Sequence, residues 1–240
     1  MAQHISRKEL KRDEVAETLV HGAEAVALHQ RAIWIGAAVV AVVALAVFGW
    51  KFYVERQTLK ASAALEEAMK VFNARIRMPG EPEEPGEVTY VAEKNKYEDA
   101  AKKFADVAEK YPRTHSGGVA RYYAGLSYEH LAQNDAAEKW LRDASSRGPE
   151  EIAALAKFQL AGLLDKENKN DEATKLYQEL LQKPGLFVPK PVVMLALADH
   201  YRKTNPQEAI KLYTQVKTEF PNSTAADEAD KQLEALSPKS

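Results

Sequence analysis

Apolar residues recur at helical spacing along most of this chain, and the stretch from Gly118 to Pro149 shows the pattern most completely. It predicts two amphipathic helices joined by a tight turn. The small residues Gly125 and Ala137 fall at the predicted crossing, because closely packed helices need a point without a large side chain. Tyr128 and Leu141 supply bulk on either side. The predicted facing stripes are Arg121, Ala124, Gly125 and Tyr128 in the first helix, and Ala137, Leu141 and Ala144 in the second.

The same unit recurs, with its second-helix alanine at positions 100, 137, 173 and 209. The second-helix positions are Ala100, Phe104, Val107 and Pro112; Ala137, Leu141, Ala144 and Pro149; Ala173, Tyr177, Leu180 and Pro184; and Ala209, Tyr213, Val216 and Pro221. The first-helix stripe recurs as Phe158, Ala161 and Gly162, and again as Met194, Leu197, Ala198 and Tyr201. Two positions depart from the pattern: Asp165 stands where tyrosine is expected, and Ala198 replaces glycine.

This spacing resembles the tetratricopeptide repeat, a helix pair with small, aromatic and proline residues at fixed offsets. The resemblance implies an all-α fold, an α-solenoid of about four helix pairs over residues 51–240. The alternative is an irregular helical bundle. Ser223 to Leu236 would form a terminal capping helix with a polar outer face, and Ser223 or Thr224 would be its amino-terminal cap.

Residues 32–50 contain no charged side chain and are bracketed by Arg31 and Lys51. Nineteen helical residues at about 1.5 Å each span close to the ~30 Å hydrocarbon core of a membrane. Trp34 and Trp50 lie near the two ends, where indole rings favour the lipid–water interface. We therefore predict a single transmembrane helix. A cleaved signal peptide, with small residues at Ala44–Ala46, and a buried helix of a soluble protein are the alternatives.

The flanks of this segment differ in character. Residues 1–31 are polar, and helical spacing from Val15 onward predicts either a short amphipathic helix or a solvated tail. After Lys51 the helix is expected to continue to about Arg77 as the first helix of repeat one. A proline- and glutamate-rich insertion loop over residues 79–95 then breaks it. This loop is either a partner-contacting arm or a tolerated surface insertion.

The chemistry-bearing residues form no catalytic pattern. The formal net charge of −2 argues against wholesale nucleic-acid binding, and the absence of cysteine excludes disulfides, thiolate metal sites and a cysteine nucleophile. No metal-binding histidine pair, phosphate loop or nucleophile elbow occurs. His130 and His200 fall at first-helix ends, where a surface or capping role is expected. We predict no enzyme activity, no cofactor, no metal and no small-molecule substrate.

The surface expected to carry function is the concave one, which the first helices of successive repeats line in a curved solenoid. Its mixture of apolar and charged groups suits an extended or helical protein segment. The alternative for each leucine is packing against a neighbouring helix. Chaperone-tail-binding relatives use Lys and Asn where Tyr122 and Leu126 stand here, so that activity is not implied. The predicted protein-binding residues are Tyr122, Leu126, Glu129, Gln159, Leu163, Lys166, Leu195, Asp199 and Arg202.

The whole layout resembles the ancillary subunit of the bacterial Sec translocon, most sharply in the exit sequence Gly49-Trp50-Lys51-Phe52-Tyr53. That resemblance implies a single-pass inner-membrane protein with a cytoplasmic amino terminus and periplasmic repeats. Translocon subunits, chaperones or client polypeptides would be its partners. The positive charges flanking the apolar segment are too evenly distributed to decide orientation. The alternative function is a structural organiser of an envelope assembly complex, such as outer-membrane or cell-division machinery.

Overall fold

The structure, a computed structural model, describes residues 7–78, 80–82 and 85–236. Within these ranges it contains nine helices and one short parallel sheet. The elements are α1 (Arg7–Phe72), β1 (Arg75–Ile76), β2 (Thr89–Tyr90), α2 (Glu93–Lys110), α3 (His115–His130), α4 (Asn134–Arg147), α5 (Glu150–Lys166), α6 (Asn170–Gln182), α7 (Lys190–Thr204), α8 (Pro206–Glu219) and α9 (Thr224–Leu236). The chain divides into two compact units, residues 1–56 and residues 57–240.

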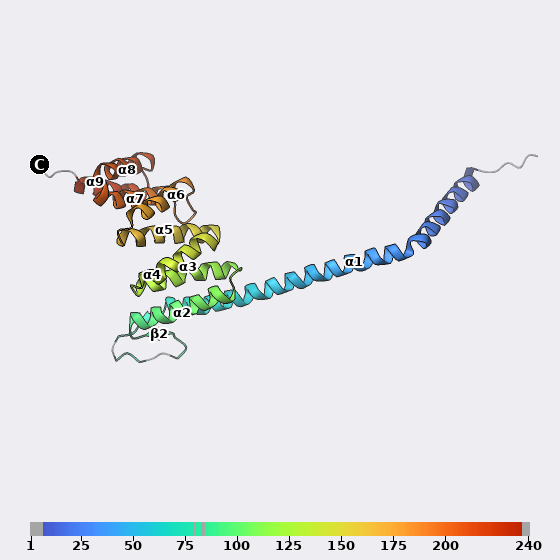
Figure 1. Cartoon of the computed structure of the whole chain (residues 1–240), viewed down its shortest axis with the longest axis horizontal. Helices are drawn as coiled ribbons and strands as arrows, with labels where there is room; N and C mark the ends of the chain where they lie inside the picture. The colour runs from blue at the N-terminus through green and yellow to red at the C-terminus, as the bar shows by residue number, and fades with distance from the viewer. Residues whose placement is uncertain (1–6, 79, 83–84, 237–240) are drawn as a thin grey trace, which may run out of the picture. The chain divides into compact units, whose positions relative to one another are not determined.

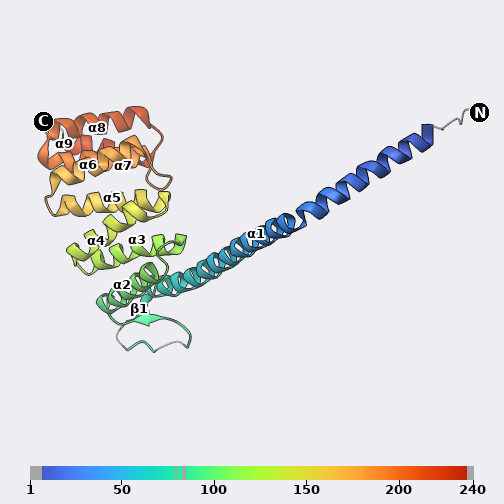
Figure 2. The same cartoon turned by 45° about the vertical axis from the view of Figure 1, so that its right-hand side comes forward.

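The second unit is a solenoid of helix pairs, as predicted. The end of α1 pairs with α2, and the pairs α3–α4, α5–α6 and α7–α8 follow (Figures 1 and 2). Helix α9 packs on α8 and closes the series. The Ser223 hydroxyl caps α9 by accepting a hydrogen bond from the Ala226 N–H at 3.1 Å, so Ser223 is the cap residue.

The helix crossings have the small residues that the repeat pattern requires. A Cβ atom added at Gly125 would lie 2.7 Å from Cγ of Leu141, so only glycine allows α3 and α4 to approach this closely. The anchor alanines Ala137, Ala173 and Ala209 are all fully buried. They belong to core clusters that join neighbouring helices along the solenoid.

Helix α1 includes the segment predicted to span a membrane. It is the one helix in the described part of the chain that is long and apolar enough to cross a bilayer, and the side chains of its apolar window are exposed. Length and composition alone support this assignment. The amphipathic pattern predicted from Val15 onward rests on side chains that lie outside the described ones, and residues 1–6 lie outside the description altogether.

The insertion in repeat one differs from the prediction. Helix α1 ends at Phe72 rather than near Arg77, because Arg75 and Ile76 instead pair in parallel with Thr89 and Tyr90. The Arg75 guanidinium lies 2.5 Å from a Glu81 carboxylate oxygen and 3.3 Å from one of Glu87, which links both sides of the insertion. Helix α2 begins at Glu93, so residues 93–95 of the predicted loop are helical.

Candidate functional site

The faces of the first helices α3, α5 and α7 form the candidate binding surface, which we call the first-helix surface. Between α3 and α5 the Glu129 carboxylate accepts two hydrogen bonds. One comes from the Gln159 amide at 2.6 Å and the other from the Lys166 ammonium at 2.8 Å. Three of the predicted residues are therefore brought together. The Lys166 side chain stays mostly exposed while the Glu129 side chain is largely covered, so the cation is the accessible member of this group.

The predicted register of α5 was wrong by one residue. Leu163 is 1% exposed and lies in the hydrophobic core, where no partner can reach it. Each of the buried residues Ala120, Ala124 and Gly125 of α3 has a buried counterpart 36 positions later in α5. The same step of 36 residues separates the second-helix alanines at positions 137 and 173. The glycine equivalent is therefore Ala161. Gly162, which the prediction used, has only the Tyr177 hydroxyl near its would-be Cβ, at 3.9 Å.

The corrected register brings Phe158, Gly162 and Asp165 to the α5 positions that correspond to Tyr122, Leu126 and Glu129 of α3. These residues were missed because a glycine in α5 was given more weight than the regular 36-residue step. The Phe158 ring packs edge-on against Tyr177 at a centroid distance of 6.0 Å. On α7 the predicted Leu195, Asp199 and Arg202 follow the corrected positions by 37 residues, which is the spacing of Ala161 and Ala198.

Two carboxylates of this surface, those of Asp165 and Asp199, lie near the hydroxyls of buried tyrosines. Burial raises the pKa of Tyr177, and the charges of Asp165 and Asp199 raise it further. Asp199 also accepts a hydrogen bond from the Tyr213 hydroxyl at 2.5 Å. Asp199 is exposed and Asp165 is partly so. The α5–α7 part of the first-helix surface therefore carries two carboxylates, together with the exposed cations of Lys166 on α5 and Arg202 on α7.

The other predicted residues are divided between surface and core. Tyr122 is half-buried against the core cluster that α4, α5 and α6 share, and Leu195 packs against the carboxy-terminal cluster. Leu126 is half-buried. Arg202 is exposed, and its guanidinium donates to the Gln232 side chain of α9 at 2.6 Å. Leu195 therefore packs within the solenoid, as the alternative for the leucines anticipated.

Of the two histidines for which a surface or capping role was predicted, His200 is not at the surface. It is 2% exposed, with Nδ1 at 2.7 Å from Asp165 and Nε2 at 2.9 Å from the Thr174 hydroxyl. A hydroxyl, an imidazole and a carboxylate thus follow one another here, and the imidazole at the centre of the three is buried. His200 instead ties α5, α6 and α7 together. His130 is exposed and stacks on Tyr97 at 4.0 Å.

The buried tyrosines predict a loss of stability in alkali. Burial, followed by the charges of Tyr123 and Glu129, raises the pKa of Tyr122 to about 12. An unfolded tyrosine titrates near pH 10, so its stabilisation is complete below about pH 10 and is lost as the pH rises toward 12. We expect the free energy of unfolding, measured with urea on the full chain in detergent, to fall over this range. The Tyr122→Phe variant should fall less steeply; an identical slope would contradict the prediction.

Stacked helix pairs with accessible first-helix faces define a helical-repeat protein, a class whose folds are typically non-catalytic interaction scaffolds. A family model described as a tetratricopeptide repeat-like domain matches residues 28–184, and a tetratricopeptide repeat model matches residues 193–223. The chain belongs to the tetratricopeptide repeat-like domain family.

Individual relatives add little to the family assignment. No curated protein matches the sequence. One matching solved structure is YrrB, described as a tetratricopeptide repeat protein with an unusual peptide-binding site. It is 23% identical, covers 57% of this chain and 74% of its own, and superposes with a TM-score of 0.41. Within the described residues no group of three or more His, Asp or Glu side chains is placed to hold a metal ion.

Proposed function

We propose that this protein is a membrane-anchored scaffold for protein–protein interactions, which holds partners or clients on its first-helix surface. The observation that carries the proposal is the presence, in one chain, of a tetratricopeptide repeat domain and an exposed apolar helix of membrane-spanning length. Tethering raises the effective concentration of a binder near its site, so that modest affinity for a partner suffices. Protein partners of the first-helix surface would be extended or helical segments.

The two carboxylates of the surface favour a segment with a basic residue. Asp165 and Asp199 lie near the Tyr177 hydroxyl, and the Phe158 ring packs on Tyr177, so an apolar side chain followed by a lysine or arginine would find both contacts. Exposed carboxylates contribute selectivity and association rate more than affinity. The packing of apolar side chains against Phe158 would therefore provide the affinity.

The resemblance of the layout and of Gly49–Tyr53 to the ancillary subunit of the Sec translocon supports a site of action beside that translocon. In this proposal the anchor lies in the bacterial inner membrane, the amino terminus is cytoplasmic and the repeats are periplasmic. The scaffold would assist protein translocation or recruit periplasmic chaperones. A reporter enzyme that is active only outside the cytoplasm, fused after Ser240, tests the orientation.

Photocrosslinking in intact cells tests the partner. A photoreactive residue at Lys166, whose side chain is 69% exposed, should form adducts with translocon subunits, chaperones or clients. The matched control is Lys231 on the outer face of α9, which is 72% exposed and should give none of them. Adducts with outer-membrane assembly or cell-division proteins would favour the structural-organiser alternative. Equal adducts from both positions would contradict a specific role for the first-helix surface.

A further inference from the structure

The connector between α6 and α7 presents two large apolar side chains to solvent. Leu186 is 82% exposed and Phe187 is 58% exposed. Val188, the next residue, is only 1% exposed because it packs into the core. The Val188 N–H donates to the Gly185 carbonyl at 3.2 Å, which closes a tight turn. The fold therefore fixes the turn at both ends and projects Leu186 and Phe187 from its tip.

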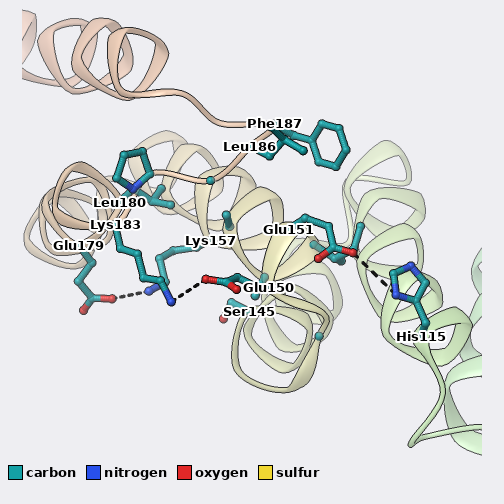
Figure 3. Close-up of a pocket in the computed structure, with 16 residues that line it drawn as sticks. His115, Ser145, Glu150, Glu151, Lys157, Glu179, Leu180, Lys183, Leu186 and Phe187 are labelled. Carbon is teal, nitrogen blue, oxygen red and sulfur yellow. Dashed lines mark hydrogen bonds and ion pairs between the residues drawn. The ribbon is translucent and has the colours of Figure 1, made fainter.

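Both tip residues line a groove of about 1010 Å³. Ile152, Ala153 and Leu180 provide further apolar lining, and His115 of α3 lines it as well. Figure 3 shows Leu186 and Phe187 on the connector, apart from the Lys157–Glu179 and Lys183–Glu150 ion pairs. A Cβ atom at Gly185 would lie 2.5 Å from Cβ of Ala154, so the connector rests directly on α5.

The tip lies on the edge of the solenoid by which the chain enters it. Ser62, near the start of the α1 portion of the second unit, lies 3.2 Å from Ser116 in the first turn of α3. His115 in turn lies 3.8 Å from Glu151 in the first turn of α5. We call this edge, formed by Ser62 and the amino-terminal ends of α3, α5 and α7, the entry edge.

The stretch of chain between the apolar segment and the second unit is short. That segment ends at Trp50 and the second unit begins at Gln57, seven residues later. Seven residues span about 10 Å as a helix and at most ~25 Å when extended. Two further exposed apolar residues, Leu59 of α1 and Val192 in the first turn of α7, lie on the same edge. The length of this stretch therefore allows a bilayer that holds the apolar segment to meet the exposed apolar side chains of the entry edge.

The charges beside the tip suit a lipid surface. Lys183 and Lys190 flank the turn, and each has a carboxylate nearby, Glu150 at 2.7 Å and Glu219 at 3.2 Å. Such exposed pairs contribute little stability, so the lysines are free to exchange carboxylates for lipid phosphates. Glu150 and Glu151 limit the net attraction. The apolar tip, rather than charge, must therefore provide most of the binding.

We propose that the Leu186–Phe187 tip inserts into the boundary between headgroups and acyl chains of the membrane that anchors the chain. The inference rests on the proposed membrane anchor. Insertion would give the repeat domain a second membrane contact besides the tether. It would orient the entry edge toward the bilayer and leave the insertion of repeat one, beyond the other end of α1, in water.

Fluorescence quenching by lipids tests this inference, since the chain has no native cysteine and accepts single labels cleanly. The full chain carrying Leu186→Cys, labelled with an environment-sensitive dye, is reconstituted into vesicles of phosphatidylcholine and phosphatidylglycerol. One nitroxide attached near the lipid carbonyls serves as quencher for positions 186 and 78, and a second nitroxide, near the ends of the acyl chains, serves as quencher for the bilayer centre. The matched control is Met78→Cys in the insertion, because Met78 is 76% exposed and equally apolar. We expect quenching at position 186 to exceed that at position 78 about threefold or more.

A third label, Val43→Cys in the apolar segment, separates the two proposals. Quenching at positions 43 and 186 but not at 78 supports both the anchor and the inserted tip. Quenching at 43 with equal, weak signals at 186 and 78 would overturn the tip proposal and leave the anchor intact. Absence of quenching at 43 would overturn the anchor, and the tip proposal with it. A blue-shifted emission at 186 without lipid quenching would assign the tip to a protein contact and would also overturn the proposal.

Discussion

Replacing Phe104 with alanine is expected to lower the free energy of unfolding by about 3–5 kcal/mol, because it removes a fully buried aromatic ring and leaves a cavity. The Phe104 side chain is 0% exposed. Its ring centroid lies 5.9 Å from that of Phe72 on α1 and 5.3 Å from that of Tyr123 on α3. One ring thus packs three helices together at the start of the solenoid.

Urea unfolding followed by circular dichroism on the full chain measures this change. Phe104→Leu fills most of the cavity and should cost clearly less than the alanine variant. Phe187→Ala is the matched control, because the same truncation at an exposed ring removes little buried area and should change stability by less than about 0.5 kcal/mol. Equal losses for Phe104→Ala and Phe187→Ala would contradict the assignment of Phe104 to the first repeat interface.

The helix pairing could be predicted because it depends on residues with few alternatives. Ala137, Ala173 and Ala209 recur at nearly constant steps, and close helix crossings permit only small side chains there. The helix ends could also be predicted, since prolines at 149, 184 and 221 stop or start helices through local backbone chemistry. Local rules of this kind do not need knowledge of the tertiary structure.

The α5 register could not be predicted from Gly162 alone, because a glycine marks a close approach only where a neighbouring element confirms it. Tyr177 leaves room at Gly162, whereas Leu141 leaves none at Gly125. The step of 36 residues between the second-helix alanines predicts the correct register of α5. The burial of His200 could not be predicted for a related reason. Its partners Asp165 and Thr174 are 35 and 26 residues away, and no local pattern connects them.

The conformations of the insertion and of the α6–α7 connector could not be predicted either, because they depend on contacts that local sequence patterns do not show. Arg75–Ile76 pairs in parallel with Thr89–Tyr90, and Arg75 also forms ion pairs with Glu81 and Glu87 across the loop. Two-residue strands leave almost no pattern in a sequence. Leu186, Phe187 and Val188 are three consecutive apolar residues, and the turn closed by Gly185 directs only Val188 inward.

Attachment to the membrane through an uncleaved apolar helix is the central claim of this account. Extraction of membranes with sodium carbonate, followed by mass measurement of the chain, tests it most directly. We predict that the whole chain of 26.7 kDa stays in the membrane pellet and that a variant lacking residues 32–50 is released. A shorter chain beginning near Val47, recovered in the soluble fraction, would show a cleaved signal peptide and would contradict the claim.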